Sequence, residues 1–471
     1  MKLHCRNPIV ILTAILVGCF AWIPAPALAA SPKEQVAAMA SAYDKSGVVG
    51  VSVIDLRSGS ALYELHADEP RTPASNQKLV TCAFAIAKLG SDFEFVTAVY
   101  RLGDDVIVVG DGDPTLGDPV LAQANGTSIY AELDKWAGAV KASFGDQPVR
   151  NVVLCVSRDP ARYRHEDWPD NQLDRWYAAP AADLNFNNNC IDIELRVSGG
   201  KIQATVHPVS RLIQVDNRLQ LGKKGDPWSA RPAKDLSTVA LLGKTSGPTG
   251  EPQSVAIDDP PMLLGRALVE RLLSAGVNIG GSLHLTRASD VDLKAANRIS
   301  ETRTPLMVAI MRANKRSLNM AAECIFLRAG DGTWEGSAAI ASQTLCKAYG
   351  LVPANLDIRE GSGLSAKDRV APSAMTAMLK ALAGNKAFVE SLPIAGEDGT
   401  LERRMKDPAS KGHVLGKTGY IAGASCLSGY VLDKSGKPAY AYSIMCNKAA
   451  DLSKARALQD NVCKTLAQAA D

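Results

Sequence analysis

The chain has 471 residues, of which 46% are hydrophobic and 21% are charged. This balance is typical of a globular protein and provides enough apolar material for two or three domains. The formal net charge is only +3 and no block rich in Lys and Arg stands out, so the composition argues against a protein that binds nucleic acid.

Residues 1–29 are predicted to be an export signal and not part of the fold. The chain begins with basic residues, continues with an apolar run over 8–23, and offers small residues for cleavage at Ala27-Leu-Ala29. The segment that ends at Cys19 resembles a lipoprotein processing site, but the apolar run continues beyond it, which favours soluble export over lipid anchoring. Both alternatives place the protein outside the cytoplasm, with the periplasm as the expected location. No later segment is long and apolar enough to span a bilayer.

Behind the signal, the sequence predicts a helix, a β-hairpin and a second helix. Residues 32–45 have an amphipathic pattern, and residues 48–54 and 61–65 alternate as two strands joined by a Ser-Gly turn. The second helix runs over 79–89 and ends at Gly90. It is apolar on nearly all sides, so we expect it to be buried.

The pattern changes near residue 92, where short apolar strands alternate with turns rich in Pro and Gly. Helical periodicity returns only at 261–275 and 305–313. We therefore predict one or more inserted β-rich domains over residues 92–299. The clearest strands of this segment are 105–109, 152–156, 191–197 and 202–206.

The last third of the chain predicts three helices, three antiparallel strands and a closing helix. Strands near both ends with helices between them predict an α/β (α+β) sandwich of an antiparallel sheet and helices. Residues 31–91 and 300–471 would form this sandwich, interrupted by the inserted segment. The predicted elements are helices at 319–328, 336–349, 372–383 and 451–469, and strands at 414–420, 425–432 and 439–446.

Eight cysteines follow the signal, an even number that permits disulfides in an oxidising compartment. Cys426 and Cys446 would lie near each other if their strands form a hairpin, and Cys155 and Cys190 share the middle region. Buried free thiols are an equally good interpretation, because these residues lie in apolar runs. No Cys-x-x-Cys and no metal-binding spacing of histidines occurs, so we expect no metal and no cofactor.

Three short motifs occur in order on these elements: Ser75-Asn-Gln-Lys78, Ser317-Leu-Asn319 and Lys417-Thr-Gly419. A Ser and a Lys three residues apart share one face of a helix, and an amine beside a hydroxyl can activate a serine without histidine. Each motif alone arises by chance. Their order, at the starts of two helices and before a strand, is typical of penicillin-binding proteins and class A β-lactamases.

Other nucleophilic or nucleotide-binding schemes each lack a residue. A P-loop needs Gly-x4-Gly-Lys-Ser/Thr, and the run from Gly412 to Thr418 is one residue too short. The elbow of α/β-hydrolases needs Gly-x-Ser-x-Gly, and the run from Gly423 to Leu427 lacks the last glycine.

From about Val49 to Cys446 the chain resembles D-alanyl-D-alanine carboxypeptidase/endopeptidases of the penicillin-binding protein 4 type. Two departures from the family pattern stand out, because Asp111 replaces a glycine and Glu360 replaces an aspartate. Besides the three motifs, the resemblance rests on Gly110-Asp-Gly-Asp-Pro-Thr-Leu116, Ala182-Asp-Leu-Asn-Phe-Asn-Asn-Asn189, Asn314-Lys-Arg-Ser-Leu-Asn-Met-Ala-Ala-Glu323 and Glu360-Gly-Ser-Gly-Leu-Ser365.

The resemblance implies a substrate and a nucleophile. The substrate would be a peptidoglycan stem peptide that ends in D-alanyl-D-alanine, or a cross-link made through D-alanine. Ser75 would form an acyl-enzyme, Lys78 would take its proton, and Ser317 would pass a proton toward the leaving amine. β-Lactams mimic the scissile peptide, so they would acylate Ser75 as well.

The resemblance also implies the residues that hold the substrate. Asn319 would bind a substrate amide and orient Lys78. Lys417, Thr418 and Gly419 would form the strand that holds the terminal carboxylate. The backbone N–H groups of Ser75 and Tyr420 would stabilise the oxyanion.

Two other functions remain open. A serine β-lactamase would share the motifs, but the long insertion argues against it. A non-catalytic protein that binds peptidoglycan or senses β-lactams would keep the fold, but the intact motifs argue against it. The aromatic residues Tyr163, Trp168 and Trp176 could line a groove for sugar or peptide, although packing is the favoured interpretation.

Overall fold

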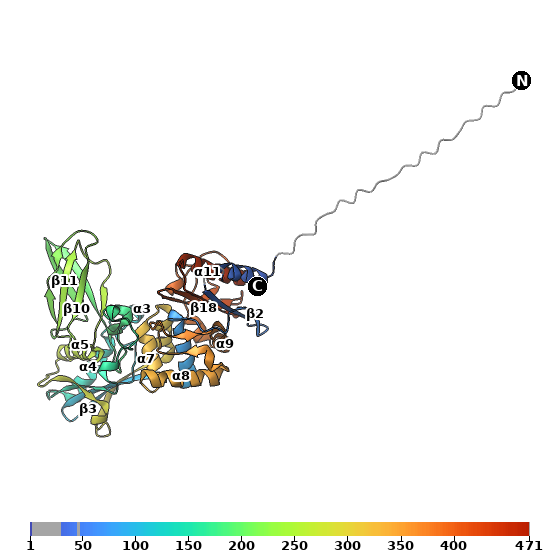
Figure 1. The fold of residues 1–471 in the computed structure, drawn as a ribbon. Coiled ribbons are helices and arrows are strands. Elements are labelled where there is room, and N and C mark those ends of the chain that lie inside the picture. Colours follow the sequence, from blue (N-terminus) through green and yellow to red (C-terminus); the bar gives the residue numbers. More distant parts are fainter. Residues whose placement is uncertain (2–29, 45–47, 471) are drawn as a thin grey trace.

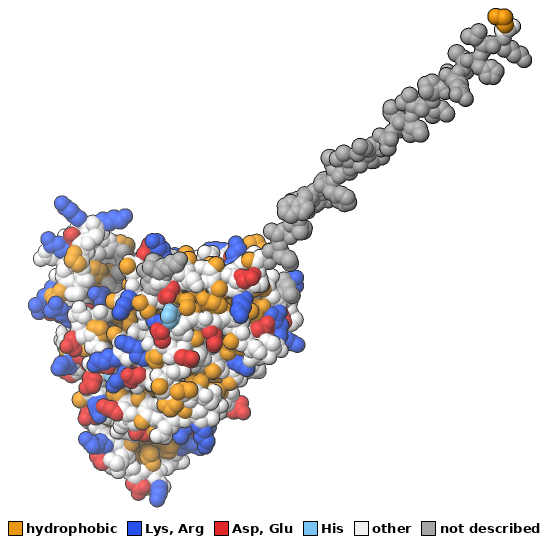
Figure 2. Space-filling view, turned by 45° about the vertical axis from the view of Figure 1, so that its right-hand side comes forward, with side chains coloured by type: hydrophobic (Ala, Val, Ile, Leu, Met, Phe, Trp, Pro, Cys, Tyr) orange, Lys and Arg blue, Asp and Glu red, His pale blue; other side chains and the backbone are white. Residues whose placement is uncertain are grey.

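The computed structural model describes residue 1 and residues 30–44 and 48–470. The predicted export signal and Cys19 lie outside the described residues. Within them, no helix combines the length and the apolar character needed to cross a membrane. Figure 1 shows the inserted segment, coloured cyan to green-yellow, beside a part built from both ends of the chain. Figure 2 shows positive and negative side chains interspersed over one face, in keeping with the small net charge.

A five-stranded antiparallel sheet joins the two ends of the chain. β1 pairs with β19 in the register Val48↔Asn447, and β1 also forms the predicted hairpin with β2. The strand order is β17-β18-β19-β1-β2. The strands are β1 (Val48–Asp55), β2 (Ser60–Leu65), β17 (Val414–Ile421), β18 (Ala424–Leu432) and β19 (Pro438–Asn447).

Helices cover both faces of this sheet, which confirms the predicted sandwich. α1 and α11 pack on one face through an apolar cluster that includes Val51 and Tyr442. The other face packs against α2 and the helices around it through a cluster that includes Phe84 and Tyr430. The helices are α1 (Pro32–Asp44), α2 (Gln77–Leu89), α6 (Leu306–Lys315), α7 (Asn319–Ala329), α8 (Trp334–Tyr349), α9 (Pro372–Leu382), α10 (Lys386–Glu390) and α11 (Leu452–Ala469).

α2 is the central helix of the second cluster, as its all-round apolar sequence predicts. Every residue from Gln77 to Ala85 is buried. Phe84 packs edge-on against Phe326 of α7, with ring centroids 6.0 Å apart. The helix that follows Ser75 is therefore fixed on several sides, which gives the start of α2 a rigid support.

The inserted segment contains a second five-stranded sheet with the order β13-β5-β4-β3-β14. β3 and β14, the first and last strands of this sheet along the chain, pair with each other, with Glu94 opposite Pro305. The chain therefore leaves and re-enters the sandwich at adjacent points. The domain boundaries at 91/92 and 299/300 stay a prediction. The strands of this sheet are β3 (Glu94–Leu102), β4 (Asp105–Gly110), β5 (Val152–Val156), β13 (Leu283–Arg287) and β14 (Asn297–Pro305).

The inserted segment also holds helices and small sheets. α5 (Pro260–Ser274) confirms the predicted helix at 261–275, whereas α4 (Ala131–Phe144) was not predicted. Both contribute to one apolar core with the second sheet. The remaining elements are α3 (Pro119–Ala124), β6 (Cys190–Ser198), β7 (Lys201–His207), β8 (Gln214–Asn217), β9 (Gln220–Leu221), β10 (Trp228–Pro232), β11 (Thr238–Thr245) and β12 (Gln253–Ala256).

The eight cysteines of the described residues are all free thiols. Cys426 and Cys446 lie on neighbouring strands, as predicted, but Cys426 stands opposite Met445 and Cys446 opposite Ser425. The two thiols therefore point to opposite faces of the sheet, because successive residues of a strand alternate. Cys155 and Cys190 likewise form no disulfide.

Candidate active site

Ser75 lies in a single turn of 3₁₀ helix, Ala74–Asn76, that runs directly into α2. Ala74 has a φ of +47°, a conformation that costs a residue with a Cβ about 1–2 kcal/mol. Gly363 packs against this turn so closely that a Cβ there would lie 1.9 Å from the Ala74 carbonyl oxygen. Ser75 is partly exposed while Lys78 is fully buried. The hydroxyl thus faces the surface with the amine beneath it.

Lys78 contacts three oxygens from three parts of the chain. Its Nζ donates to Ser75 Oγ at 3.2 Å, to Asn319 Oδ1 at 2.6 Å and to the Ser362 carbonyl at 2.8 Å. These contacts use the three hydrogens of an ammonium group. Once Lys78 loses a proton, its nitrogen can accept the proton of the neighbouring Ser75 hydroxyl.

Burial makes that neutral form accessible. Loss of solvent lowers the pKa of Lys78 to about 8, and the charge of the nearby Glu360 carboxylate is the strongest influence that opposes this shift. A lysine with its ordinary pKa near 10.4 would be almost wholly charged at neutral pH. The site therefore moves Lys78 toward the range in which a general base works.

Lys417 and Ser317 form a second pair of amine and hydroxyl. Lys417 Nζ donates to Ser317 Oγ and to the Thr418 carbonyl, both at 2.9 Å. Burial, followed by the charge of Lys78, lowers the pKa of Lys417 well below its usual value. Ser317 has a φ of +56°, at the turn between α6 and α7. Two buried lysines therefore lie within electrostatic reach of each other beside two hydroxyl groups.

β17 lies directly against the turn that carries Ser75. Asn76 Nδ2 donates to the Lys417 carbonyl at 2.7 Å, and Asn76 Oδ1 accepts from Ser428 Oγ at 2.6 Å. A Cβ on Gly419 would lie 2.6 Å from the Pro73 carbonyl oxygen, so only glycine fits without displacement. Tyr420 follows and is 56% exposed. The oxyanion role of the Ser75 and Tyr420 N–H groups stays a prediction.

Two further side chains complete the surroundings of the site. Asn319 begins α7 and is 6% exposed, and its Nδ2 donates to the Tyr177 carbonyl of the inserted segment at 2.7 Å. Substrate binding by Asn319 stays a prediction. Thr418, which is half-buried, donates its hydroxyl to Thr400 Oγ1 at 2.8 Å.

The structure thus brings the three motifs together, and it adds groups that the sequence did not single out. Asn76 stands inside the first motif, and Thr400 lies in the segment that precedes β17. The contacts from the Ser362 and Tyr177 carbonyls leave no signal in the sequence, because any residue can supply a backbone oxygen.

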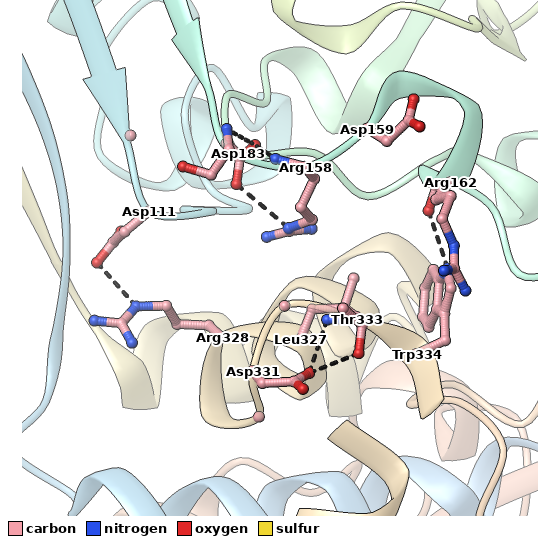
Figure 3. A pocket seen from close by; sticks show the side chains of 14 residues that line it. Asp111, Arg158, Asp159, Arg162, Asp183, Leu327, Arg328, Asp331, Thr333 and Trp334 are labelled. Atoms are coloured by element: carbon pink, nitrogen blue, oxygen red, sulfur yellow. Dashed lines mark hydrogen bonds and ion pairs between the residues drawn. The ribbon is translucent and has the colours of Figure 1, made fainter. Parts of the chain in front are cut away.

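A cavity of about 490 Å³ lies elsewhere, at the far end of α7 (Figure 3). The cavity lies between α7 and α8 on one side and the inserted segment on the other. Arg328 Nε donates a hydrogen bond across it to Asp111 Oδ2 at 3.2 Å. Arg158 and Asp183 form a second ion pair on its wall, at 3.3 Å. None of the motif residues lines it. Asp111, one of the departures from the family pattern, therefore connects the two parts of the chain and lies apart from Ser75.

Two of the three aromatic residues considered for a groove are packed in the interior. Tyr163 and Trp168 are buried, as the packing interpretation predicts, whereas Trp176 is 44% exposed. Trp168 donates its indole N–H to Glu360 Oε2 at 3.2 Å. The ring therefore anchors the loop behind Lys78 and offers no surface to a substrate.

Comparison with known proteins identifies relatives along most of the chain. D-alanyl-D-alanine carboxypeptidase of Actinomadura sp. (strain R39) is 28% identical over 431 residues, which span 84% of this chain and 77% of that protein. D-alanyl-D-alanine carboxypeptidase DacB of Haemophilus influenzae is 27% identical over 391 residues, which span 77% of this chain and 78% of DacB.

Solved structures show the same fold. The crystal structure of penicillin binding protein 4 (dacB) from Haemophilus influenzae matches with a TM-score of 0.73 at 21% identity, over 92% of this chain and 98% of that chain. Its complex with a novel β-lactam matches with a TM-score of 0.69 at 21% identity, over 91% and 98% of the two chains. The fold predicted from the sequence is confirmed.

The family model for D-Ala-D-Ala carboxypeptidase 3 (S13) matches residues 33–469. This range includes both halves of the sandwich and the whole inserted segment, and it confirms the resemblance seen in the motifs. The chain belongs to the D-Ala-D-Ala carboxypeptidase 3 (S13) family.

Proposed function

We propose that this protein is a serine-type D-alanyl-D-alanine carboxypeptidase/endopeptidase of peptidoglycan stem peptides, with Ser75 as its nucleophile. The observation that supports this best is the contact between Lys78 Nζ and Ser75 Oγ at 3.2 Å, on a buried lysine held by Asn319. No histidine is needed, because the neutral amine serves as the base.

In this proposal Ser75 Oγ attacks the carbonyl carbon of the penultimate D-alanine while its proton passes to Lys78. The resulting oxyanion is held by the N–H groups of Ser75 and Tyr420, each donor being worth about 3 kcal/mol. Collapse of the tetrahedral intermediate breaks the peptide bond, and Ser317 relays a proton to the departing amine. Water then hydrolyses the ester and regenerates the Ser75 hydroxyl.

Lys417 and Thr418 supply the charge and the hydroxyl for the terminal carboxylate. The cation of Lys417 lies beside Ser317, so a carboxylate bound there would raise the pKa of Lys417 and hold it protonated. Endopeptidase cleavage of a cross-link uses the same acyl-enzyme. The Haemophilus influenzae protein of the same fold has been solved with a β-lactam bound, and we propose that β-lactams likewise acylate Ser75.

We further propose that residues 1–29 direct export, so that the enzyme works in the periplasm on its cell-wall substrate. Peripheral or lipid-anchored association with the membrane, through Cys19, is the alternative. The proposed catalytic domain consists of residues 31–91 and 300–471, and residues 92–299 form the inserted part. The pairing of β3 with β14 supports a single inserted part, and β14 (Asn297–Pro305) crosses the proposed boundary at 299/300.

The test is release of D-alanine from a stem peptide that ends in D-alanyl-D-alanine, by wild type and by Ser75→Ala. We expect release by wild type and none by the variant. Ser453→Ala is the matched control, because Ser453 is an exposed serine in the first turn of another helix. Rapid multiple turnover of penicillin would instead support a β-lactamase, and binding without release of D-alanine would support a non-catalytic protein.

A further inference from the structure

Three buried carboxyl groups lie behind the lysine of the nucleophile. Glu323 stands one helical turn after Asn319 on α7, and Glu360 and Asp368 lie in the loop between β15 (Leu356–Asp357) and β16 (Arg369–Val370). All three have no exposed surface. None forms an ion pair with Lys or Arg within the described part of the chain. Three negative charges so placed would be very unfavourable without protons.

The hydrogen bonds show where the negative charge lies. Glu360 Oε1 accepts from the Gly363 N–H at 2.5 Å, and Glu360 Oε2 accepts from Ser362 Oγ at 2.8 Å and from Trp168 Nε1 at 3.2 Å. Three donors on one carboxyl group favour its ionised form. The pKa of Glu360 is lowered in spite of its burial, first by hydrogen bonds with Glu323 and Asp368 and then by those from Ser362 and Gly363.

The hydrogen bonds of the other two carboxyl groups favour the protonated form. Glu323 Oε2 accepts from the Gly361 N–H at 2.7 Å, and Asp368 Oδ1 accepts from the Arg359 N–H at 2.8 Å. The second oxygen of each, Glu323 Oε1 and Asp368 Oδ2, is buried and has no partner as an acceptor. Both groups adjoin Glu360, and burial with its charge raises their pKa values well above the usual range. A proton on each of these oxygens, donated to Glu360, satisfies all three groups.

This cluster is connected to Lys78 through the loop 360–363. Ser362 uses its hydroxyl on Glu360 and its carbonyl on Lys78 Nζ. The Glu360 carbonyl accepts from Gln77 Nε2 at 3.2 Å, and the Gly361 carbonyl accepts from Thr81 Oγ1 at 2.7 Å. A change at Glu360 therefore reaches Lys78 by a short path of contacts.

We propose that Glu323, Glu360 and Asp368 share two protons and a single negative charge on Glu360, and that this charge holds the 360–363 loop and stabilises the protonated form of Lys78. The inference rests on the proposed function and deepens it. Glu360 does not touch the substrate, so it is a positioning residue. It sets the pH at which the base becomes active.

Other charged and titratable groups also face Lys78. Lys417 approaches from β17 and, when charged, favours the neutral form of Lys78. Cys82 lies one turn further along α2, and burial raises the pKa of its thiol to about 12, so it stays neutral in the working range. Of the groups around Lys78, Glu360 is the one that opposes Lys417 with a full charge.

Three isosteric substitutions test the distribution of charge: Glu360→Gln, Glu323→Gln and Asp368→Asn. The measurement is the rate of acylation by penicillin as a function of pH. In Glu360→Gln we expect the midpoint of the acid limb to fall by about one pH unit, because a buried charge is lost. In the other two variants a neutral acid becomes a neutral amide, so we expect the midpoint to stay where it is in the wild type.

The conservative variant Glu360→Asp keeps the charge and should return the midpoint toward that of the wild type. An unmoved midpoint in Glu360→Gln overturns the inference. An equal shift in Glu323→Gln or Asp368→Asn also overturns it, because the charge would then not reside on Glu360.

An infrared measurement remains decisive should Glu360→Gln fail to fold. The intensity of the infrared carbonyl band of protonated carboxylic acids, measured at neutral pH, reports how many buried carboxyl groups hold a proton. We expect Glu323 and Asp368 each to contribute to this band in the wild type. Each of Glu323→Gln and Asp368→Asn should therefore lose one such group, and no loss of band intensity in either variant contradicts the inference. The infrared band does not depend on acylation, so it tests the shared protons separately from the proposed function. An enzyme that penicillin never acylates would refute the proposed function alone.

Discussion

Lys78 Nζ lies 3.2 Å from Ser75 Oγ and 2.6 Å from Asn319 Oδ1, so one buried amine links the first and second motifs. The relationship depends on the fold as well as on the sequence. Ser75 and Lys78 are neighbours along one helix turn, whereas Asn319 is brought in by the packing of α7 against α2. This geometry gives the amine both a proton to take and an acceptor that orients it.

Replacing Lys78 by Met removes the base and keeps an unbranched side chain of similar length. We expect acylation by penicillin to slow by about two to four orders of magnitude, the usual contribution of a general base. Lys78→Arg should be equally slow, because guanidinium stays protonated. Stopped-flow acylation measures the rate, and circular dichroism checks the fold. A rate within threefold of the wild type in either variant would exclude Lys78 as the base.

The pH dependence of acylation follows from the lowered pKa of Lys78. Burial sets that pKa to about 8, and only the neutral amine accepts the Ser75 proton. The rate should therefore fall about tenfold for each pH unit below this value and level off above it. Acylation rates measured from pH 5 to pH 9 check this slope, which is the one expected when a single proton is lost. A rate that rises as the pH falls would contradict a lysine base.

Gly419→Ala tests the contact between β17 and the nucleophile turn. The added methyl group would lie 2.6 Å from the Pro73 carbonyl oxygen, and such overpacking typically costs about 1–3 kcal/mol. We expect a lower Tm and slower acylation together, because Ser75 lies two residues after Pro73, in the turn that the methyl group would displace. Gly138→Ala is the matched control, since a Cβ there meets no atom within 4 Å. Equal effects of the two substitutions would show that the close approach is not required.

Asp111→Ala tests whether the cavity of Figure 3 contributes to acylation or only to stability. Asp111 Oδ1 accepts from the Val96 N–H at 2.9 Å and its Oδ2 from Arg328. Loss of these contacts should lower the free energy of unfolding by about 1 kcal/mol. The rate of acylation should be unchanged. Denaturant unfolding and penicillin labelling measure the two effects, and a tenfold loss of labelling in a folded variant would place the cavity in the catalytic machinery.

Much of the fold could be predicted, because its helices and strands carry clear periodicity. α2 and the β17–β19 strands are examples, since their apolar runs are bounded by turn residues. α4 also has apolar residues at helical spacing, among them Leu133, Trp136 and Val140, yet it was missed among the surrounding strands. The sequence could not predict to which face of the sheet the thiols of Cys426 and Cys446 point, because this depends on the register of the hairpin.

The candidate site could be predicted as far as its side chains form motifs. The carboxyl groups of Glu323 and Glu360 stood in recognised segments, but their proximity depends on how the 360–368 loop folds against α7. Asp368 had no motif at all. Contacts made by the Ser362 and Tyr177 carbonyls are fixed by tertiary packing, so the sequence contains no pattern for them.

The most direct measurement of the central claim is the site of covalent attachment of penicillin. Wild type and Ser75→Ala are incubated with penicillin, digested, and analysed by mass spectrometry. We predict one adduct, on Ser75, that is absent from the variant. An adduct on another residue, or equal labelling of Ser75→Ala, would contradict the assignment of Ser75 and Lys78 as nucleophile and base.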